Sequence, residues 1–191
     1  DYATLSQYNI VFFNCGLDDS HIDGKDFFGG SATIDSTAVA NLKQFVQNGG
    51  SVYASDWAYT IVETAWPDEV DFDGTDNAWV EGSSGTPKTG APFDGLAGTI
   101  VDTNLAAGMG GSSIALDYKL SDWVVMQNVA SDVTVYIRGD APLNGGFFGS
   151  GGGTLTDVPH TVGFAYGGGH VLYTSFHQEP GVNQGQERVL Q

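Results

Sequence analysis

Three side chains at the ends of two predicted strands could carry out acid–base or nucleophilic chemistry. The stretch GGGHVLYTSFHQEP, residues 167–180, is a glycine run followed by an alternating apolar strand, and His177 and Glu179 stand at its end. Asp56 stands at the bend of SVYASDWAYTIVE, between a predicted strand and a predicted helix. Such bends lie at the carboxyl edge of open α/β sheets, where these folds place their sites. The pattern predicts a shared site of Asp56, His177 and Glu179.

An aspartate at this bend allows two roles. A carboxylate is a poor nucleophile toward an amide, but it can attack an alkyl carbon or act as a general base for water. One hypothesis is therefore a hydrolase that uses Asp56 with His177 and Glu179. The other is that Asp56 only caps the helix that begins at Trp57, which aspartate does well.

Acidic residues are concentrated in DEVDFDGTDNAWVE, residues 68–81. The candidate ligands in this stretch are Asp68, Asp71, Asp73, Asp76 and Glu81. Calcium prefers six to eight oxygen ligands, several of them from closely spaced carboxylates in a glycine-turned loop. The stretch is not an EF-hand, because its glycine comes too early and no glutamate follows at the twelfth place. A calcium site is one interpretation, and a solvated acidic loop is the other.

The remaining metal-binding and redox residues are sparse. Cys15 is the single cysteine, so no internal disulfide can form, and we expect it to be a small buried apolar residue. The four histidines are scattered, which disfavours zinc or iron. His160 and His170 could approach each other across the last predicted hairpin, but we expect both at the surface.

The charge balance restricts the partners. The 191 residues contain 6 Lys+Arg and 23 Asp+Glu, which gives a net charge of −17. Such a field repels nucleic acids and anionic lipids and favours divalent cations, cationic partners or neutral sugars. No stretch approaches the roughly 20 apolar residues of a membrane span. The few lysines and many Gly and Asp residues predict an extracellular, cell-surface or periplasmic protein, of which this chain is a mature or trimmed piece.

The first third of the chain alternates between strand and helix patterns. A buried strand is predicted in YNIVFFNCG (8–16), a helix in DSTAVANLKQFVQNGG (35–50), a strand at 51–55 and a helix at 56–66 that Pro67 ends. In the helix, Gly49 is placed for the left-handed residue after the last turn. This order predicts a parallel sheet with right-handed crossovers, in which residues 9–14 and 51–55 are adjacent.

The middle of the chain is different. Residues 67–95 are acidic and rich in Gly, and they precede several β-rich runs. These predicted strands are 98–102, 112–118, 122–128 and 132–138. A glycine loop (143–157) and a final hairpin around 167–169 follow, and a helix begins near Asn183. We expect a single domain over 1–191, with an atypical loop and β-rich insertion at about 67–157.

Three segments, in order and spacing, resemble a known superfamily. YNIVFFNCG, LKQFVQNGGSVYASDWA and GGGHVLYTSFHQEP are similar to the class I glutamine amidotransferase-like proteins, and most of all to their trehalose-utilisation-type (ThuA-like) branch. The resemblance covers roughly the first 65 and the last 30 residues. It implies a flavodoxin-like fold, with a three-layer arrangement around a parallel sheet.

The resemblance also assigns roles to residues. Active amidotransferases carry a cysteine in the strand-to-helix bend, and the matching frame here is Ala54–Ala58, so the cysteine position falls on Asp56. The family's histidine matches His177 and its acidic partner matches Glu179. The resemblance thus implies that the base and its orienting residue are present while the nucleophile is replaced, so glutaminase activity is not expected.

Two functions follow as hypotheses. The first is a non-catalytic amidotransferase-like binding or structural module of an exported or cell-surface protein. This module would be calcium-stabilised and self-assembling, or would contact other domains of a longer chain or a carbohydrate. The alternative is a hydrolase of a small or carbohydrate-derived substrate. An enzyme needs Asp56 and His177 within hydrogen-bond reach in an open cleft, whereas a binding module can have that cleft filled by Trp57 or by residues 67–95.

Overall fold

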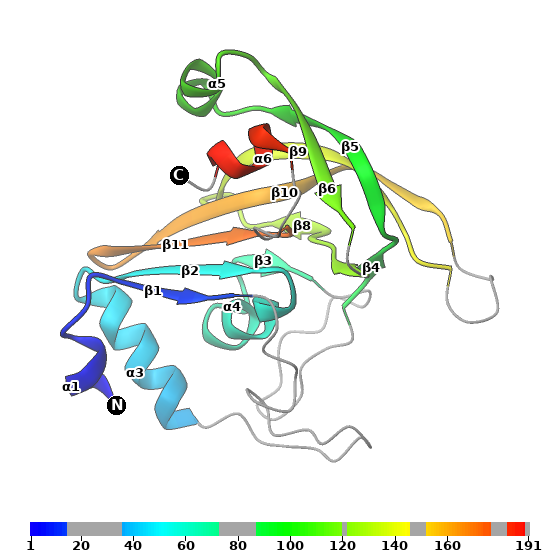
Figure 1. Ribbon diagram of the computed structural model, residues 1–191. Helices are drawn as coiled ribbons and strands as arrows, with labels where there is room; N and C mark the ends of the chain where they lie inside the picture. The colour runs from blue at the N-terminus through cyan, green and yellow to red at the C-terminus, as the bar shows by residue number, and fades with distance from the viewer. Residues whose placement is uncertain (15–35, 73–86, 120–121, 146–151, 177–182, 190–191) are drawn as a thin grey trace.

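The computed structural model describes residues 1–14, 36–72, 87–119, 122–145, 152–176 and 183–189 (Figure 1). Its helices are α1 (Tyr2–Leu5), α3 (Ser36–Gln47), the short 3-10 helix η1 (Asp56–Ala58), α4 (Tyr59–Ala65), α5 (Thr103–Met109) and α6 (Gln184–Val189). Its strands are β1 (Ile10–Phe13), β2 (Ser51–Ser55), β3 (Val70–Asp71), β4 (Thr89–Gly90), β5 (Phe93–Ile100), β6 (Ser113–Tyr118), β7 (Trp123–Val124), β8 (Asn128–Val129), β9 (Thr134–Pro142), β10 (Thr154–Tyr166) and β11 (Gly169–Thr174). No helix within these described ranges is long and apolar enough to span a bilayer.

A seven-stranded sheet with the order β1-β2-β11-β10-β9-β5-β6 organises the molecule (Figure 1). β1, β2 and β11 are parallel, and the remaining neighbours pair antiparallel. The predicted α/β fold is confirmed, and so is the parallel pairing of the first two strands, which aligns Ile10 with Ser51. The β-rich stretch adds β5, β6 and β9 to this same sheet.

The segment from α3 to β2 follows directly from its sequence pattern. α3 buries Leu42, Phe45 and Val46 on one face, as its 3.6-residue period requires. Gly49 has φ +103°, and the Gly49 N–H donates to the Val46 carbonyl at the helix end. This left-handed residue was predicted, and it turns the chain directly into β2. The result is a core between α3, α4 and one face of β2, β11 and β10.

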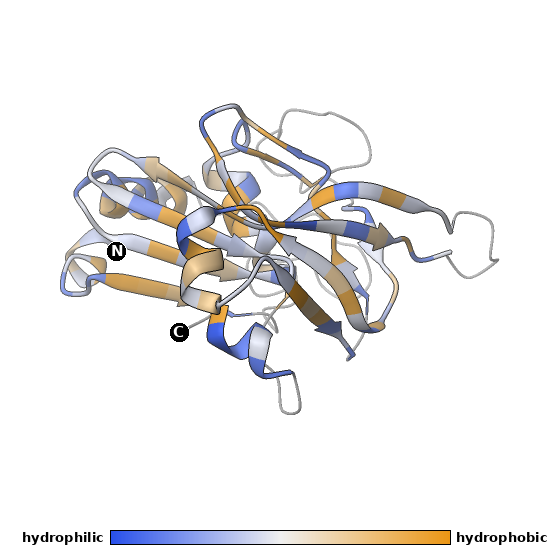
Figure 2. Cartoon of the chain, turned by 90° about the horizontal axis from the view of Figure 1, so that it is seen from above, coloured by the Kyte–Doolittle hydropathy of each residue, from blue (hydrophilic) through white to orange (hydrophobic). Residues whose placement is uncertain are grey.

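A second core lies where the sheet curls (Figures 1 and 2). It is formed by side chains of β5, β6, β9 and β10 together with Trp123 and Phe176. The pairing of β9 with β10 shifts register between Pro159 and Thr161 and again between Thr161 and Val162. Such bulges bend a strand and change which face its side chains occupy, so β10 contributes to both cores.

Two strand predictions were wrong in extent. The glycine loop expected at 143–157 gives way to β10 at Thr154, because residues 154–155 pair with the end of β9. The strand expected at 122–128 is divided into β7 and β8, which pair with the short strands β4 and β3. In both cases the available partner strand, rather than local propensity, sets the bounds.

The outer edge of β6 is closed by side chains from α6. Gln186 accepts a hydrogen bond from the Asp117 N–H at 2.6 Å and donates to the Asp117 carbonyl at 3.4 Å. Asn183 Nδ2 donates to the Ala115 carbonyl at 2.8 Å. The two amides therefore occupy the backbone groups that a further strand would need. Asp117 completes the contact by accepting from the N–H groups of Gly95 and Asn183.

Candidate functional site

Asp56 occupies a strained bend at the carboxyl edge of the sheet. β2 ends at Ser55, which pairs with Thr174 of the parallel strand β11, so both strands end at the same level. Asp56 follows with φ +48°, a left-handed value that is uncommon for a residue with a side chain. Such conformations cluster at sites where the surrounding structure holds them in place.

Hydrogen bonds from distant segments hold this residue. Asp56 is 3% exposed, and its Oδ1 accepts from the Val124 N–H of β7 at 2.9 Å. The Tyr173 hydroxyl donates to the Asp56 carbonyl at 2.8 Å. The predicted capping role is wrong, because Ser55 occupies the cap position of η1 and the Asp56 carboxylate reaches a strand 68 residues away.

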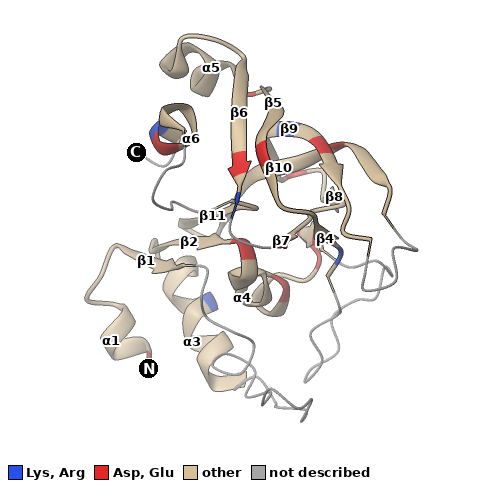
Figure 3. Cartoon of the chain, turned by 45° about the vertical axis from the view of Figure 1, so that its right-hand side comes forward, with Lys and Arg blue, Asp and Glu red and all other residues tan. Residues whose placement is uncertain are grey.

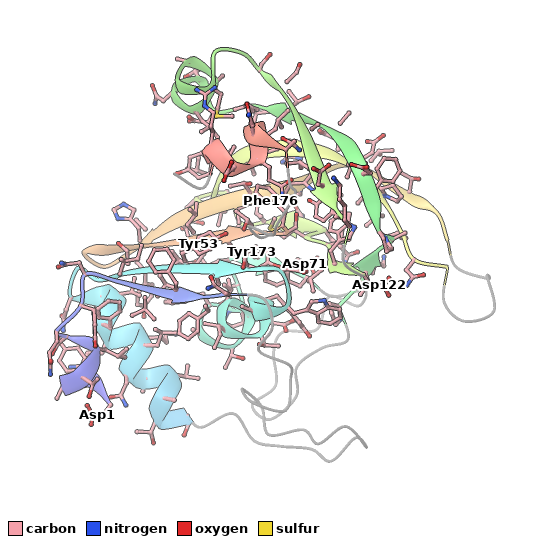
Figure 4. All side chains as sticks on the ribbon, viewed as in Figure 1. Asp1, Tyr53, Asp71, Asp122, Tyr173 and Phe176 are labelled. Carbon is pink, nitrogen blue, oxygen red and sulfur yellow. The ribbon has the colours of Figure 1, made fainter. Side chains whose placement is uncertain are left out.

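Residues 122–124, called the β7 segment below, cover the bend. Trp123 is 1% exposed and its indole N–H donates to the Ala91 carbonyl at 2.9 Å. Trp57 donates to the Asp122 carbonyl at 3.0 Å and so ties η1 to the same segment. Figure 4 labels Asp122, which directly precedes β7, and Tyr173 of β11. The bend is therefore covered by the buried residues Trp123 and Val124, and the half-buried Trp57 is hydrogen-bonded to the residue before them.

A buried polar network lies beside the bend. The Tyr118 hydroxyl is 2.6 Å from His160 Nδ1 and 2.7 Å from Ser175 Oγ. All three residues are at most 4% exposed, and the Tyr118 ring stacks on Trp123 at 4.0 Å. Among the described residues His160 Nε2 has no hydrogen-bond partner, although backbone groups of Gly139 and Asp140 lie close to the imidazole ring. The network joins β6, β10 and the end of β11.

Burial controls the protonation of this network. It lowers the pKa of His160 from 6.5 to about 4, with backbone groups of Gly139 and Asp140 opposing the shift. Burial also raises the pKa of Tyr118 well above 10; the hydrogen bond to Ser175 lowers it and the charge of Asp56 adds to the increase. At neutral pH the imidazole and the phenol are thus uncharged. The charge of Asp56 lies close enough to the Tyr118 hydroxyl to contribute to its raised pKa.

Sequence reasoning missed this network. We expected both His160 and His170 at the surface, which is right for His170 and wrong for His160: His160 is fully buried and His170 is exposed. The two histidines lie toward opposite ends of the β10–β11 pairing, because His170 pairs with Ala165 and Thr161 pairs with Thr174. In the structure β10 is buried without interruption around His160, from Val158 to Phe164, and its sequence there shows no simple alternation that predicts this burial. Nothing in the sequence pointed to Tyr118 or Ser175.

The other predicted catalytic residues, His177 and Glu179, lie outside the described residues. Phe176, the last described residue before them, is 1% exposed and belongs to the second core (Figure 4). Their role stays a prediction.

The predicted calcium ligands are only partly described. Asp68 is exposed and Asp71 is half-buried in β3, while Asp73, Asp76 and Glu81 lie outside the described residues, as do Cys15 and His21. Within the described ranges no three His, Cys, Asp or Glu side chains are grouped as metal ligands. The pKa of Glu69 is raised by burial and by the charges of Asp132 and Asp68. Calcium binding stays a prediction.

Comparison with known proteins identifies the fold. No protein-family model matches the chain, and no curated protein matches it. The structure is similar to a ThuA-like protein from Bacteroides uniformis, with a TM-score of 0.57 and 13% identity over 99% of this chain and 69% of that chain. The chain shares the fold of ThuA-like proteins. The amidotransferase-like fold implied by the sequence resemblance is therefore supported, whereas the replacement of a cysteine by Asp56 stays a prediction.

Two cytoplasmic proteins of Salmonella typhimurium also share the fold. Their TM-scores are 0.55 and 0.54, at 13% and 12% identity over 97% and 91% of this chain. The chain spans 67% and 62% of their lengths. This finding contradicts the predicted extracellular, cell-surface or periplasmic location. That prediction was wrong because an acidic, lysine-poor composition reports on solubility and carries no information on compartment.

Proposed function

We propose that the chain is a non-catalytic binding or structural module built on an amidotransferase-like fold. The observation that supports this most is the state of Asp56, whose carboxylate is buried and bonded to the Val124 N–H beneath the β7 segment. A catalytic carboxylate must reach its substrate or a water molecule, and this one is engaged in holding β7. Asp56 then serves to position η1 and β7.

A substrate screen with an isosteric variant tests the proposal. Asp56→Asn keeps an oxygen acceptor for the Val124 N–H and removes the charge. We expect the wild type to hydrolyse panels of aryl esters, aryl glycosides and haloalkanes no faster than Asp56→Asn. A turnover that the wild type shows and Asp56→Asn lacks, at equal melting temperature, would refute the non-catalytic role.

One observation favours the alternative hydrolase. The φ of +48° at Asp56 is a strained value of the kind found at reactive bends, and it lies at the edge where β2 and β11 both end. In that alternative Asp56 is the nucleophile or base, His177 exchanges the proton and Glu179 orients His177. The β7 segment would then have to move aside, so activity should rise in a Trp123→Ala variant that still folds.

Calcium binding at Asp68, Asp71, Asp73, Asp76 and Glu81 is a further part of the proposal. The surroundings of Glu69 support it: burial raises the pKa of Glu69 most, and the charges of Asp132 and Asp68 add to the increase, so a cation here would offset nearby negative charge. Added calcium should raise the melting temperature and a chelator should reverse the increase. An unchanged melting temperature in millimolar calcium would contradict the site.

A further inference from the structure

The two edges of the main sheet differ in whether their outward backbone groups are hydrogen-bonded. At β6 the side chains of Asn183 and Gln186 occupy the outward backbone groups. At the other edge, the Ser51 N–H of β2 donates to the Asn9 carbonyl, so strand alternation turns the backbone groups of Ile10 and Phe12 away from β2. In the part of the chain that the structure describes, no strand pairs with this outer side of β1.

The surface beside this open edge is apolar. Tyr8 is 59%, Ile10 44% and Phe12 60% exposed, which makes them three of the most exposed large apolar residues described. The Phe12 ring lies 5.7 Å from that of Tyr53, on the face of β1 and β2 opposite α3. Parallel strands are normally covered on both faces, and proteins usually protect an apolar edge strand with charges or a covering segment.

We propose that the outer edge of β1 binds an extended segment of another polypeptide, in which apolar residues alternate with Arg or Lys, as an added strand. The backbone groups of Ile10 and Phe12 would supply hydrogen bonds, and their side chains would cover the apolar residues of the segment. Addition of a strand to an exposed edge is an established mode of peptide recognition. The inference names a partner for the binding module proposed above, but it concerns a surface distinct from Asp56.

Charge selects a basic partner. The net charge is −17, and Figure 3 marks the Lys, Arg, Asp and Glu residues of the described ranges. The cations in these ranges already have internal partners. Those pairs are Lys43 with the Tyr166 ring, Lys88 with Gln127, Lys119 with Asp94 and Asp117, Arg138 with Asp157, and Arg188 with the Gly108 carbonyl. The outer field is thus negative, and the exposed rings of Tyr8 and Phe12 offer faces for guanidinium or ammonium groups.

The same observations disfavour a second copy of the chain. Two copies would each bring a charge of −17 to the interface. The four residues of β1 also offer far less area than the roughly 800 Å² per partner of a stable protein–protein interface. A short basic segment has the opposite charge and needs less contact area than a second folded copy.

Fluorescence anisotropy with labelled peptides tests the proposal. The probe is an eight-residue peptide of alternating valine and arginine, and the controls are the same residues in two blocks and an alternating valine–glutamate peptide. We expect the alternating basic peptide to bind with micromolar affinity that weakens as salt rises. Phe12→Lys and Ile10→Pro should each weaken binding at least about tenfold, since proline removes an outward N–H without breaking the pairing with β2. Phe93→Lys, at an exposed aromatic residue of β5, should leave binding unchanged.

Four results would overturn the inference. The blocked peptide could bind as well as the alternating one, or Phe12→Lys could bind like the wild type, and either would indicate non-specific attraction to an acidic protein. The protein alone could dimerise in a manner abolished by Phe12→Lys, which would assign the edge to a second copy. No binding of the alternating peptide would also refute it. None of these results depends on the hydrolysis screen, so failure here and failure of the non-catalytic role are distinguishable.

Discussion

Acidification should unfold the protein by forcing a proton onto a buried histidine. His160 is fully buried and its Nδ1 is hydrogen-bonded to the Tyr118 hydroxyl. The charged groups that face this network are Asp140 beside His160 and Asp56 beside Tyr118. Neither offsets the burial of an imidazolium, so the folded state resists protonation while the unfolded state accepts the proton freely.

The size of the effect follows from the shift. The pKa of His160 falls from 6.5 to about 4, and each pKa unit corresponds to about 1.4 kcal/mol. The stabilisation is complete above the unfolded pKa and is lost as the pH falls through the window from 6.5 to 4, because only the unfolded state gains a proton there. The free energy of unfolding should therefore decrease by about 3 kcal/mol across this window.

Urea denaturation from about pH 7 to pH 4 measures this loss. Many carboxylates titrate at the lower end of this range, so the informative quantity is the difference between variants. His160→Gln keeps a polar side chain but cannot be protonated, and its stability should depend on pH by about 3 kcal/mol less than that of the wild type. His170→Gln, at an exposed position of the same hairpin, should behave like the wild type. Parallel pH profiles for the wild type and His160→Gln would refute the reasoning.

Three other substitutions test the packing. Tyr173→Phe removes the hydrogen bond to the Asp56 carbonyl and should cost about 1–3 kcal/mol in urea denaturation, while Tyr8→Phe at the surface should cost nothing measurable. Asp117→Ala should release α6, seen as faster amide exchange of residues 184–189. In the wild type, the contact between the Asp117 carboxylate and Asn183 should weaken only in acid. Burial raises the pKa of Asp117, but hydrogen bonds from Gly95 and Asn183 bring it below 3.8, so the contact is lost only as the pH falls through this lowered pKa. Gly169→Ala would drive its Cβ into the Gly50 carbonyl oxygen and should lower the melting temperature strongly, whereas Gly153→Ala meets no described atom within 4 Å and should be neutral. Equal melting temperatures would contradict the described contact of β11 with the turn before β2.

The elements predicted well are those whose interactions are local. α3 follows from the spacing of Leu42, Phe45 and Val46, and its end follows from Gly49, all within one segment. The parallel pairing of β1 with β2 follows from the handedness of a strand–helix–strand unit. The position of Asp56 at the bend follows from the adjoining strand and helix patterns.

The parts that could not be predicted depend on contacts between distant segments. The Val124 N–H that binds Asp56 comes from 68 residues away, and Ser175 lies 57 residues from Tyr118. The bulges of β10 change the face that its side chains occupy, so no simple alternation places His160. A single sequence carries no record of which strands become neighbours, and therefore neither the network nor the β7 cover could be inferred.

The closed edge at β6 has a consequence for how copies of this protein can associate. A filament that grows by sheet extension needs two free edges on every subunit, one to accept and one to be accepted. Here Asn183 and Gln186 leave a single usable side. Edge-to-edge contact between molecules must therefore stop at a pair, and the side-chain amides of Asn183 and Gln186 protect a glycine-rich chain from fibrous polymerisation along its sheet.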